Sequence, residues 1–350
     1  MSKQAKSIAA SIEAWFVDHA RDLPWRKRRT RWRSFVSEIM LQQTQVARVE
    51  ERFEAFMNKF PTPRALAEAS EDAVNAAWSG LGYYRRARNL QAAAVKIHKD
   101  HGGRVPVRAG ALLDLPGVGR YTAGAVASIA CGQAEPIVDG NVHRVLARLD
   151  ADNAPLDDKE ASVRTWKRAR ELVEASDSPG VFNEGLMELG SQVCTRHSPA
   201  CSDCPVRRWC KARKQDLVDV IPPARKRVEK TIEHHHAIGI VRQGKFVMQR
   251  RPSKGRWAGL WQMPTVEAAR RLGDTEIKRR LGMPVQGLTH VSSFERVLTH
   301  RRIRFHVYRA KLAKGQRVPR GDRWIPSGQS MTELPLGVAQ ELTLKALKLI

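Results

Sequence analysis

Four cysteines between residues 194 and 210 have the spacing of a metal site. They follow the pattern C-x6-C-x2-C-x5-C, and thiolates so close in sequence can converge on one zinc ion or on one iron–sulfur cluster. The spacing itself does not separate these two centres. The fifth cysteine, Cys131, stands apart and is expected to be an inert core residue. The predicted ligands are Cys194, Cys201, Cys204 and Cys210.

Two carboxylates stand in contexts that suit acid–base chemistry. Glu38 lies between Phe35 and Ile39 in an otherwise apolar helical stretch, where burial would raise its pKa and favour the acid form. Asp139 precedes Gly140 and a helical run, so we expect it to cap that helix. A carboxylate fixed at a helix start can stay ionised and stabilise or attack a cation. The alternatives are a solvated helix glutamate at position 38 and a purely structural cap at position 139.

The segment LPGVGRYTAG (115–124) predicts a helix–hairpin–helix turn. Gly117 and Gly119 allow a tight turn with outward-facing N–H groups, and the next helix adds the positive end of its dipole. Together these groups could hold a DNA phosphate without reading a base. An ordinary turn is the alternative.

Composition narrows the class of partner. The chain has 350 residues, a formal net charge of +25 and an isoelectric point near 10.5, which predicts a polyanionic partner, most often nucleic acid. No apolar run approaches the roughly 20 residues of a membrane span. The N-terminus has no apolar signal core, and the cysteines do not resemble a disulfide framework, so we expect a cytoplasmic location.

Helical periodicity dominates residues 1–216, which predicts many helices of ordinary length and no strand-rich section. Five apolar residues recur with a period close to 3.6 residues and predict the buried face of a helix: Phe35, Ile39, Val46, Val49 and Phe53. Residues 217–233 carry Ile221-Pro222-Pro223 and Arg225-Lys226-Arg227 and are predicted to be an exposed linker between domains.

Residues 234–350 have a different pattern and predict a small α+β domain. Segments 237–241 and 245–249 flank a turn at Gln243-Gly244, which indicates a hairpin. Residues 303–308 alternate as a half-buried strand does, and residues 266–281 could form an intervening helix.

The order of these motifs along the chain resembles the adenine DNA glycosylases of the MutY family, within the helix–hairpin–helix glycosylase superfamily. The resemblance covers nearly the whole chain. It implies a [4Fe–4S] cluster on the four cysteines and a Nudix-like domain at 234–350. It also implies a bacterial, nucleoid-associated monomer that removes adenine mispaired with 8-oxoguanine or guanine in double-stranded DNA. The motifs are LPWR (23–26), SEIMLQQTQV (37–46), GLGYYRRARNL (80–90), LPGVGRYTAGAV (115–126), VDGNVHRVLARL (138–149) and GRWAGLWQMP (255–264).

The resemblance also implies catalytic roles. Glu38 would protonate the departing adenine, and Asp139 would stabilise or attack the oxocarbenium ion. Asn141 and Tyr121 would line the same site. Lyase relatives have a Schiff-base lysine where this chain has Tyr121, so we expect a monofunctional enzyme. The competing hypotheses are a bifunctional pyrimidine-damage glycosylase and lyase, and a catalytically silent iron–sulfur protein that binds DNA.

DNA-handling residues follow from the same resemblance. Gln43 and Thr44 would contact bases beside the flipped adenine, while Leu81 and Tyr83 would wedge beside 8-oxoguanine. The basic run 26–33 is either a phosphate-binding strip or a solvated loop.

In the C-terminal domain, residues 296–300 correspond to a damage-reading loop that in the family commonly reads H-x-F-S-H. Arg296, Leu298 and Thr299 replace its first, third and fourth residues. Thr299 and His300 remain candidate contacts to the base opposite adenine. This departure leaves open the strength of the preference for 8-oxoguanine over guanine.

Two further features of this domain bear on metals. The stretch 266–282 lacks the paired glutamates of a Mg²⁺-binding Nudix box, which argues against pyrophosphate hydrolysis. His234-His235-His236 opens a predicted strand without a cysteine or carboxylate cluster nearby, which does not favour a metal site there.

Overall fold

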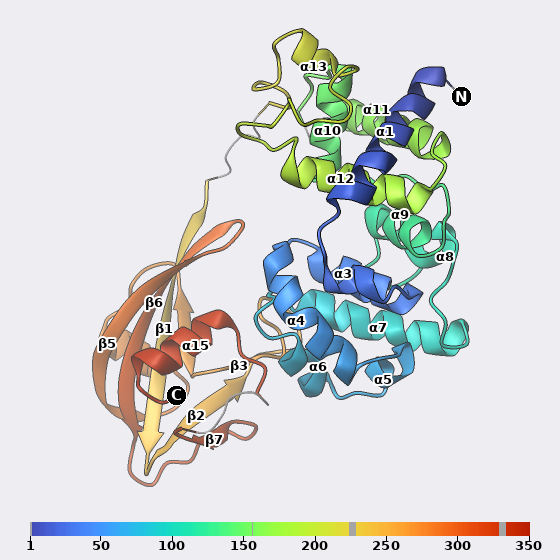
Figure 1. Ribbon diagram of the computed structural model, residues 1–350. Coiled ribbons are helices and arrows are strands. Elements are labelled where there is room, and N and C mark those ends of the chain that lie inside the picture. The colour runs from blue at the N-terminus through green and yellow to red at the C-terminus, as the bar shows by residue number, and fades with distance from the viewer. Residues whose placement is uncertain (1, 156, 224–228, 329–333) are drawn as a thin grey trace. The chain divides into compact units, whose positions relative to one another are not determined.

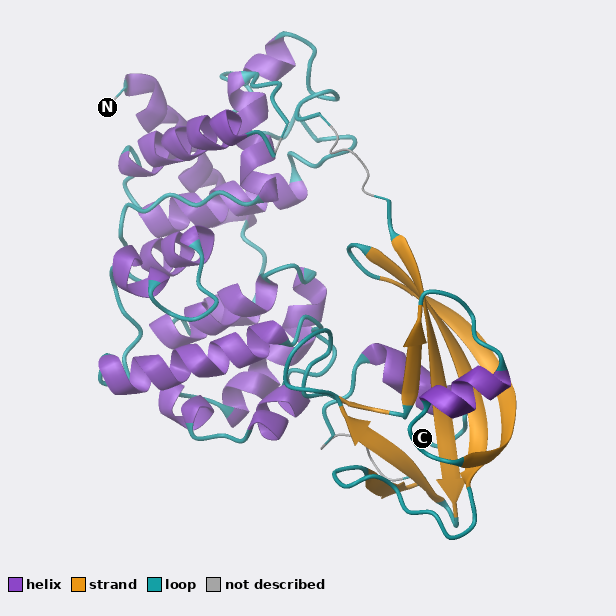
Figure 2. Ribbon diagram, turned by 180° about the vertical axis from the view of Figure 1, so that it is seen from behind, coloured by secondary structure: helices purple, strands orange, loops and turns teal. Residues whose placement is uncertain are grey.

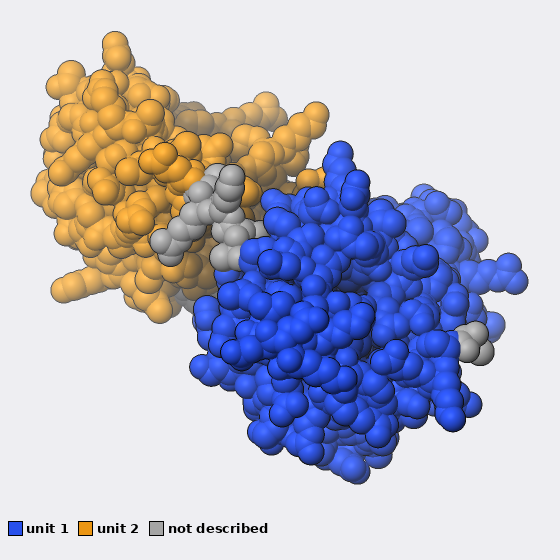
Figure 3. All heavy atoms as spheres, turned by 90° about the horizontal axis from the view of Figure 1, so that it is seen from above, with its two compact units in different colours: residues 1–68, 89–226 blue, residues 69–88, 227–350 orange. Residues whose placement is uncertain are grey.

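The computed structural model describes residues 2–155, 157–223, 229–328 and 334–350 (Figure 1). The chain forms two compact units, 1–68 with 89–226 and 69–88 with 227–350, which are coloured separately in Figure 3. The predicted combination of a mainly α region and an α+β region is confirmed. Part of the predicted linker, Arg225-Lys226-Arg227, lies outside the described residues. Among those that are described, no helix has the length and apolarity to cross a membrane.

Unit 1 is helical, and side-chain caps begin several of its helices. Ser2, Thr30 and Asp158 each accept a hydrogen bond from the backbone N–H three residues further on. The helices are α1 (Lys3–His19), α2 (Pro24–Lys27), α3 (Arg31–Leu41), α4 (Val46–Lys59), α5 (Pro63–Ala67), α7 (Arg85–Asp100, from Asn89 onward), α8 (Ala109–Leu113), α9 (Arg120–Ile129), α10 (Gly140–Asp150), α11 (Lys159–Glu174), α12 (Pro179–Gln192) and α13 (Lys211–Lys214).

The buried period expected over 35–53 belongs to two helices, not one. Helix α3 ends at Leu41 and α4 begins at Val46, with Gln43 between them in the left-handed region at φ +55°. The apolar period continues across the break because Phe35 and Phe53 are both fully buried. The turn therefore leaves Glu38 one turn before the end of α3.

Unit 2 is built on a β-sheet, whose strands are orange in Figure 2. The sheet has seven strands in the order β3-β2-β1-β6-β5, with β4 on β1 and β7 on β2. Strands β1 and β6 are parallel, and the other pairs are antiparallel. The strands are β1 (Thr231–Arg242), β2 (Lys245–Arg250), β3 (Trp261–Gln262), β4 (Thr265–Ala268), β5 (Val285–Val297), β6 (Arg301–Leu312) and β7 (Arg323–Pro326); the helices are α6 (Glu71–Ala77), the start of α7, α14 (Asp274–Arg280) and α15 (Val338–Ala346).

A helix packs on each face of this sheet. Tyr308 lies in one hydrophobic cluster with Ile277 of α14, and its neighbour Val307 lies in another with Leu344 of α15. Successive residues of a strand point to opposite faces, so β6 contributes to both cores.

The predicted hairpin is confirmed, since Arg242 pairs with Lys245 across Gln243-Gly244. The predicted strand at 303–308 also forms, within β6. The helix expected over 266–281 is wrong in its first half. Residues 265–268 form β4 against β1, and Gly273 precedes the seven-residue helix α14.

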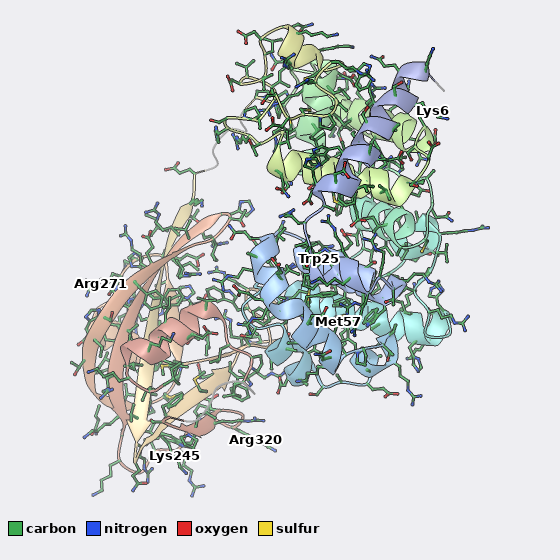
Figure 4. The ribbon with its side chains drawn as sticks, viewed as in Figure 1. Lys6, Trp25, Met57, Lys245, Arg271 and Arg320 are labelled. Carbon is green, nitrogen blue, oxygen red and sulfur yellow. The ribbon has the colours of Figure 1, made fainter. Side chains whose placement is uncertain are left out.

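Four side chains on one face of β1, β6 and β5 form a hydrogen-bonded chain. Nδ1 of His234 lies 2.9 Å from Nε2 of His306, and Nδ1 of His306 lies 3.1 Å from Oγ of Ser293. That hydroxyl lies 2.9 Å from Nε2 of His290. Burial, with smaller contributions from His236 and from Arg271, which is labelled in Figure 4, lowers the pKa of His306 to about 4.

We expect unit 2 to lose stability in mild acid. An unfolded histidine titrates near 6.5, so between pH 6.5 and about 4 the folded chain binds fewer protons at His306 than the unfolded chain does. The free energy of unfolding therefore falls as pH decreases through this window and is insensitive to His306 above pH 7. Hydrogen exchange of β5 and β6 at pH 7.5 and 5.5, corrected for intrinsic rates, would measure this. A His306→Gln chain should show a smaller pH difference; equal differences in both chains would contradict the assignment.

Candidate active site

A cavity of about 190 Å³ in unit 1 brings together five of the residues predicted from the sequence. Helices α2, α3, α9, α10 and α12 contribute to its wall, and Trp25, labelled in Figure 4, is one of the apolar residues. The predicted residues that line it are Glu38, Thr44, Tyr121, Asp139 and Asn141. Motifs that are far apart in the sequence thus line a single cavity.

Glu38 is a buried acid facing this cavity. Its side chain is buried in α3, and Oε2 has no hydrogen-bond partner among the described residues. Burial and, to a smaller extent, the negative charge of Glu184 raise the pKa of Glu38 to about 7, while a hydrogen bond with Tyr121 opposes the rise. Glu38 can therefore carry a proton near neutral pH, as the apolar sequence around it predicted.

Asp139 holds the start of α10 in the expected way. Its Oδ1 accepts a hydrogen bond of 2.7 Å from the N–H of Val142. Burial raises the pKa of Asp139, but the N–H groups of Val142 and Asn141 and the charge of Arg144 oppose this. Arg144 Nη2 also donates to Asn141 Oδ1 at 2.9 Å and to Gly190 O at 2.6 Å, which fixes this end of the helix. The two carboxyl groups of the cavity thus have different surroundings: Glu38 is buried with Oε2 unpartnered among the described residues, and Asp139 accepts a capping hydrogen bond.

Tyr121 keeps its hydroxyl neutral beside Glu38. Burial raises the pKa of Tyr121 well above its usual value, and the charge of Glu38 adds to the effect. The hydroxyl donates to Sδ of Met187 at 2.9 Å. Tyr121 is therefore a hydrogen-bond donor in the wall of the cavity.

A network of ion pairs on α12, not predicted from the sequence, lines the same cavity. Arg26 contacts Glu184 at 3.0 Å and Glu188 at 3.1 Å, and Arg29 contacts Glu184 at 2.7 Å. Burial alone would raise the pKa of Glu188, but hydrogen bonds and charges from Arg21 and Arg26 bring it to about 2. Two acidic residues four positions apart in a mostly apolar helix are the signal that could have identified them.

These ion pairs account for part of the basic run 26–33. Arg26 and Arg29 are paired with buried carboxylates, so for them neither a phosphate-binding strip nor a solvated loop is right. Arg31 Nη1 donates to the carbonyl of Val105 at 2.7 Å, and Arg33 pairs with Glu54. Four arginines of the run thus make hydrogen bonds or ion pairs within the protein.

The predicted DNA contacts of unit 1 lie at two places. Thr44 lines the cavity, whereas Gln43 is exposed in the turn before α4. Gly117 has φ +78°, and a Cβ there would lie 2.6 Å from Cβ of Asn89, so only glycine fits. Gly119 is the N-cap of α9, whose first N–H groups face the hairpin turn.

The predicted contacts to the opposite base meet within unit 2. Oη of Tyr83 lies 3.2 Å from Oγ1 of Thr299, although 216 residues separate them. Tyr83 is 51% exposed, but Leu81 is only 5% exposed, so in this state Leu81 does not project as a wedge. His300 follows Thr299 at the tip between β5 and β6.

The four cysteines of the motif form a group whose chemistry fits an iron–sulfur cluster. Burial, with smaller contributions from the neighbouring thiols of Cys194, Cys210 and Cys201, raises the pKa of Cys204 to about 12, although a backbone hydrogen bond from Val206 opposes this. Arg148 Nη1 lies 3.4 Å from Sγ of Cys194. A guanidinium cation in this position would stabilise the thiolate form of Cys194 on metal binding. Among the described residues, however, no three potential ligands are drawn together closely enough to hold a metal ion.

Comparisons with known proteins identify the family of the chain. Residues 36–171 match the HhH-GPD superfamily of base excision DNA repair proteins, and residues 236–346 match the NUDIX domain. The chain is 35% identical to adenine DNA glycosylase of Homo sapiens, over 92% of this chain and 70% of that protein. It is 36% identical to adenine DNA glycosylase of Rattus norvegicus, over 85% and 69%. The structure of a thermostable thymine-DNA glycosylase is similar with a TM-score of 0.54 and 27% identity, over 61% of this chain and 98% of that chain. The chain therefore belongs to the adenine DNA glycosylase family, and it is a DNA glycosylase that hydrolyses N-glycosidic bonds.

Proposed function

We propose that this glycosylase removes adenine paired with 8-oxoguanine or guanine in double-stranded DNA and leaves the strand intact. The observation that carries the proposal is the shared cavity of Glu38, a buried acid with a pKa near 7, and Asp139, a capped carboxylate. Two carboxyl groups in different environments can divide acid catalysis from stabilisation of a cationic sugar.

The reaction begins with extrusion of the adenine, because the bond to be broken is not accessible inside the duplex. Glu38 then donates its proton to the departing base. The carboxylate of Asp139 faces the sugar, where positive charge develops, and is held in place by Val142 N–H. Glu184, which lines the same cavity and is held by Arg26 and Arg29, favours the protonated form of Glu38 through its negative charge.

The same site argues against a lyase step. A lyase needs an amine nucleophile that forms a Schiff base with the sugar, and Tyr121 offers a hydroxyl with a raised pKa. The bifunctional pyrimidine-damage glycosylase is therefore the weaker alternative. A catalytically silent DNA-binding protein is also weaker, because it would have no use for the buried acid.

The test is single-turnover adenine release from an 8-oxoG:A duplex, with and without alkali. We expect strand breaks only after alkali treatment, because hydrolysis leaves an abasic site. Breaks without alkali at the rate of base release would indicate the bifunctional enzyme. No base release from protein that binds the duplex would indicate the silent one.

We further propose that Cys194, Cys201, Cys204 and Cys210 hold a [4Fe–4S] cluster. Four soft sulfur donors and the neighbouring Arg148 suit such a group. When bound, the cluster would stabilise this loop and take no part in bond cleavage. Cys204→Ser is expected to lower the iron content of the purified chain and its visible absorbance to a small fraction of wild type. Cys131→Ser is the matched control and should keep both; equal loss would contradict the ligand set.

Recognition of the opposite base is the third part of the proposal. Tyr83 and Thr299 form a hydrogen bond with each other and present two hydroxyl groups. His300, the next residue, adds an imidazole. These groups can donate and accept hydrogen bonds at a base edge. The hairpin turn at Gly117 and Gly119 would hold a backbone phosphate, and the enzyme would act as a monomer.

A further inference from the structure

The tip between β5 and β6 has little backbone support of its own. Val297 pairs with Arg302, and the N–H of Leu298 donates to the carbonyl of Arg301 at 2.7 Å. Thr299 and His300 lie beyond this last bond, and both are exposed. Their position therefore depends on the side chains packed beneath the tip.

Trp257 packs beneath this hairpin together with Leu298. Both side chains contact one small hydrophobic cluster of unit 2, formed by Ile303, Phe305 and Ala339. The ring of Trp257 lies 6.3 Å from that of Phe305, between ring centroids. Phe294 of β5 packs on the same cluster and stacks on Phe305, with 4.9 Å between ring centroids. Trp257 is thus the large side chain that reaches this cluster from outside the β5–β6 hairpin.

Trp257 occupies this place in an unfavourable backbone conformation. Its φ is +54°, a region that bulky side chains rarely adopt. Such a conformation persists where the surroundings enforce it, and such positions gather at ligand-contacting sites. Here the guanidinium groups of Arg251 and Arg256 lie 5.6 and 5.4 Å from the indole, and Arg251 Nε donates to the carbonyl of Arg256 at 2.9 Å.

Ion pairs tie the loop of Trp257 to the hairpin itself. Glu233 on β1 contacts Arg256 Nη1 at 2.7 Å and also pairs with Arg301, the first residue of β6. One carboxylate thus links the residue before Trp257 to the residue after His300. Packing and charge fix the same two segments to each other.

We propose that Trp257 is a positioning residue for Thr299 and His300, and that it determines how well the enzyme distinguishes 8-oxoguanine from guanine opposite adenine. This inference rests on the function proposed above. Trp257 contacts no reacting atom. It acts by holding the loop so that Thr299 keeps its hydrogen bond with Tyr83.

The experiment compares Trp257→Ala with Trp324→Ala in the full chain. Trp324 is a partly buried tryptophan of the same unit that packs on a different cluster, so it controls for loss of an indole. Single-turnover rates on 8-oxoG:A and G:A duplexes give the discrimination ratio. We expect Trp257→Ala to lower this ratio about fivefold, the effect of losing one neutral hydrogen bond, and Trp324→Ala to leave it unchanged. Adding Leu298→Phe to Trp257→Ala should restore most of the ratio by returning bulk to the cluster.

Hydrogen exchange at residues 296–302 is measured on the same proteins without DNA. It should be faster in Trp257→Ala and not in Trp324→Ala, whatever base the enzyme removes. Unchanged exchange in Trp257→Ala would overturn the positioning role even if adenine release were as proposed. Faster exchange with equal rate losses on both duplexes would overturn the role in discrimination. If the wild type released no adenine, the proposed function and the discrimination role would both fail, and the exchange result would still decide whether Trp257 positions the loop.

Discussion

Glu38→Gln is expected to lower the single-turnover rate of adenine release by about 10²–10⁴-fold, the contribution of a positioned general acid. Glutamine keeps the size of the side chain and its hydrogen bonding but has no acidic proton to give. Because burial raises the pKa of Glu38 to about 7, the wild-type rate should also fall as pH rises through 7, where the acid form is lost. The variant should lack this dependence.

Affinity for an uncleavable duplex distinguishes a chemical defect from a folding defect. Glu38→Gln should bind as wild type does, since Glu38 Oε2 has no hydrogen-bond partner to lose among the described residues. Glu50→Gln, an exposed change on α4, is the control and should keep full activity. A rate within a few-fold of wild type for Glu38→Gln would remove Glu38 from the mechanism.

Asp139→Asn is expected to lower the rate of adenine release by about 10²–10³-fold while leaving the melting temperature nearly unchanged. Asparagine caps a helix about as well as aspartate, so the hydrogen bond to Val142 N–H survives and only the charge is lost. Asp139→Ala should lose the activity and also about 1 kcal/mol of stability, because the cap goes as well.

Asp158 provides a matched control for this experiment. It caps α11 through a 2.7 Å hydrogen bond from Ala161 N–H, with the same geometry as Asp139 on α10. Asp158→Asn should change neither rate nor stability. If Asp139→Asn behaved in the same way, Asp139 would be a structural cap only.

The candidate site could be predicted from sequence where local physics decides the outcome. The apolar surroundings of Glu38 predicted that it is buried, and the residues after Asp139 predicted a cap; both are confirmed. Glu184 could not be found in this way, because its effect on Glu38 depends on packing between residues 146 positions apart. The basic run was misread for the same reason, since charge counts do not reveal that Arg26 has buried partners on α12.

The fold shows the same limit. Periodicity predicted helices in the first region and the 237–249 hairpin in the second, since both depend on residues close in sequence. It did not reveal the break at Gln43, where the apolar period continues across a turn. Strand β4, at the start of the predicted helix, also escaped it, because residues 265–268 form a strand through pairing with β1, which lies far away in sequence.

The assignment of residues 69–88 to the second unit has a consequence for the protein during its synthesis. Tyr84 Oη donates to the carbonyl of Leu336 at 2.7 Å, and Arg88 Nη1 donates to the carbonyl of Ala258 at 2.8 Å. Ala258 follows Arg88 by 170 residues, which a ribosome adds in roughly 10–30 s. During that interval the segment has left the ribosome without these partners. A nascent chain stalled before Ala258, or a fragment cut at residue 223, would therefore carry residues 69–88 without the part of unit 2 against which they fold.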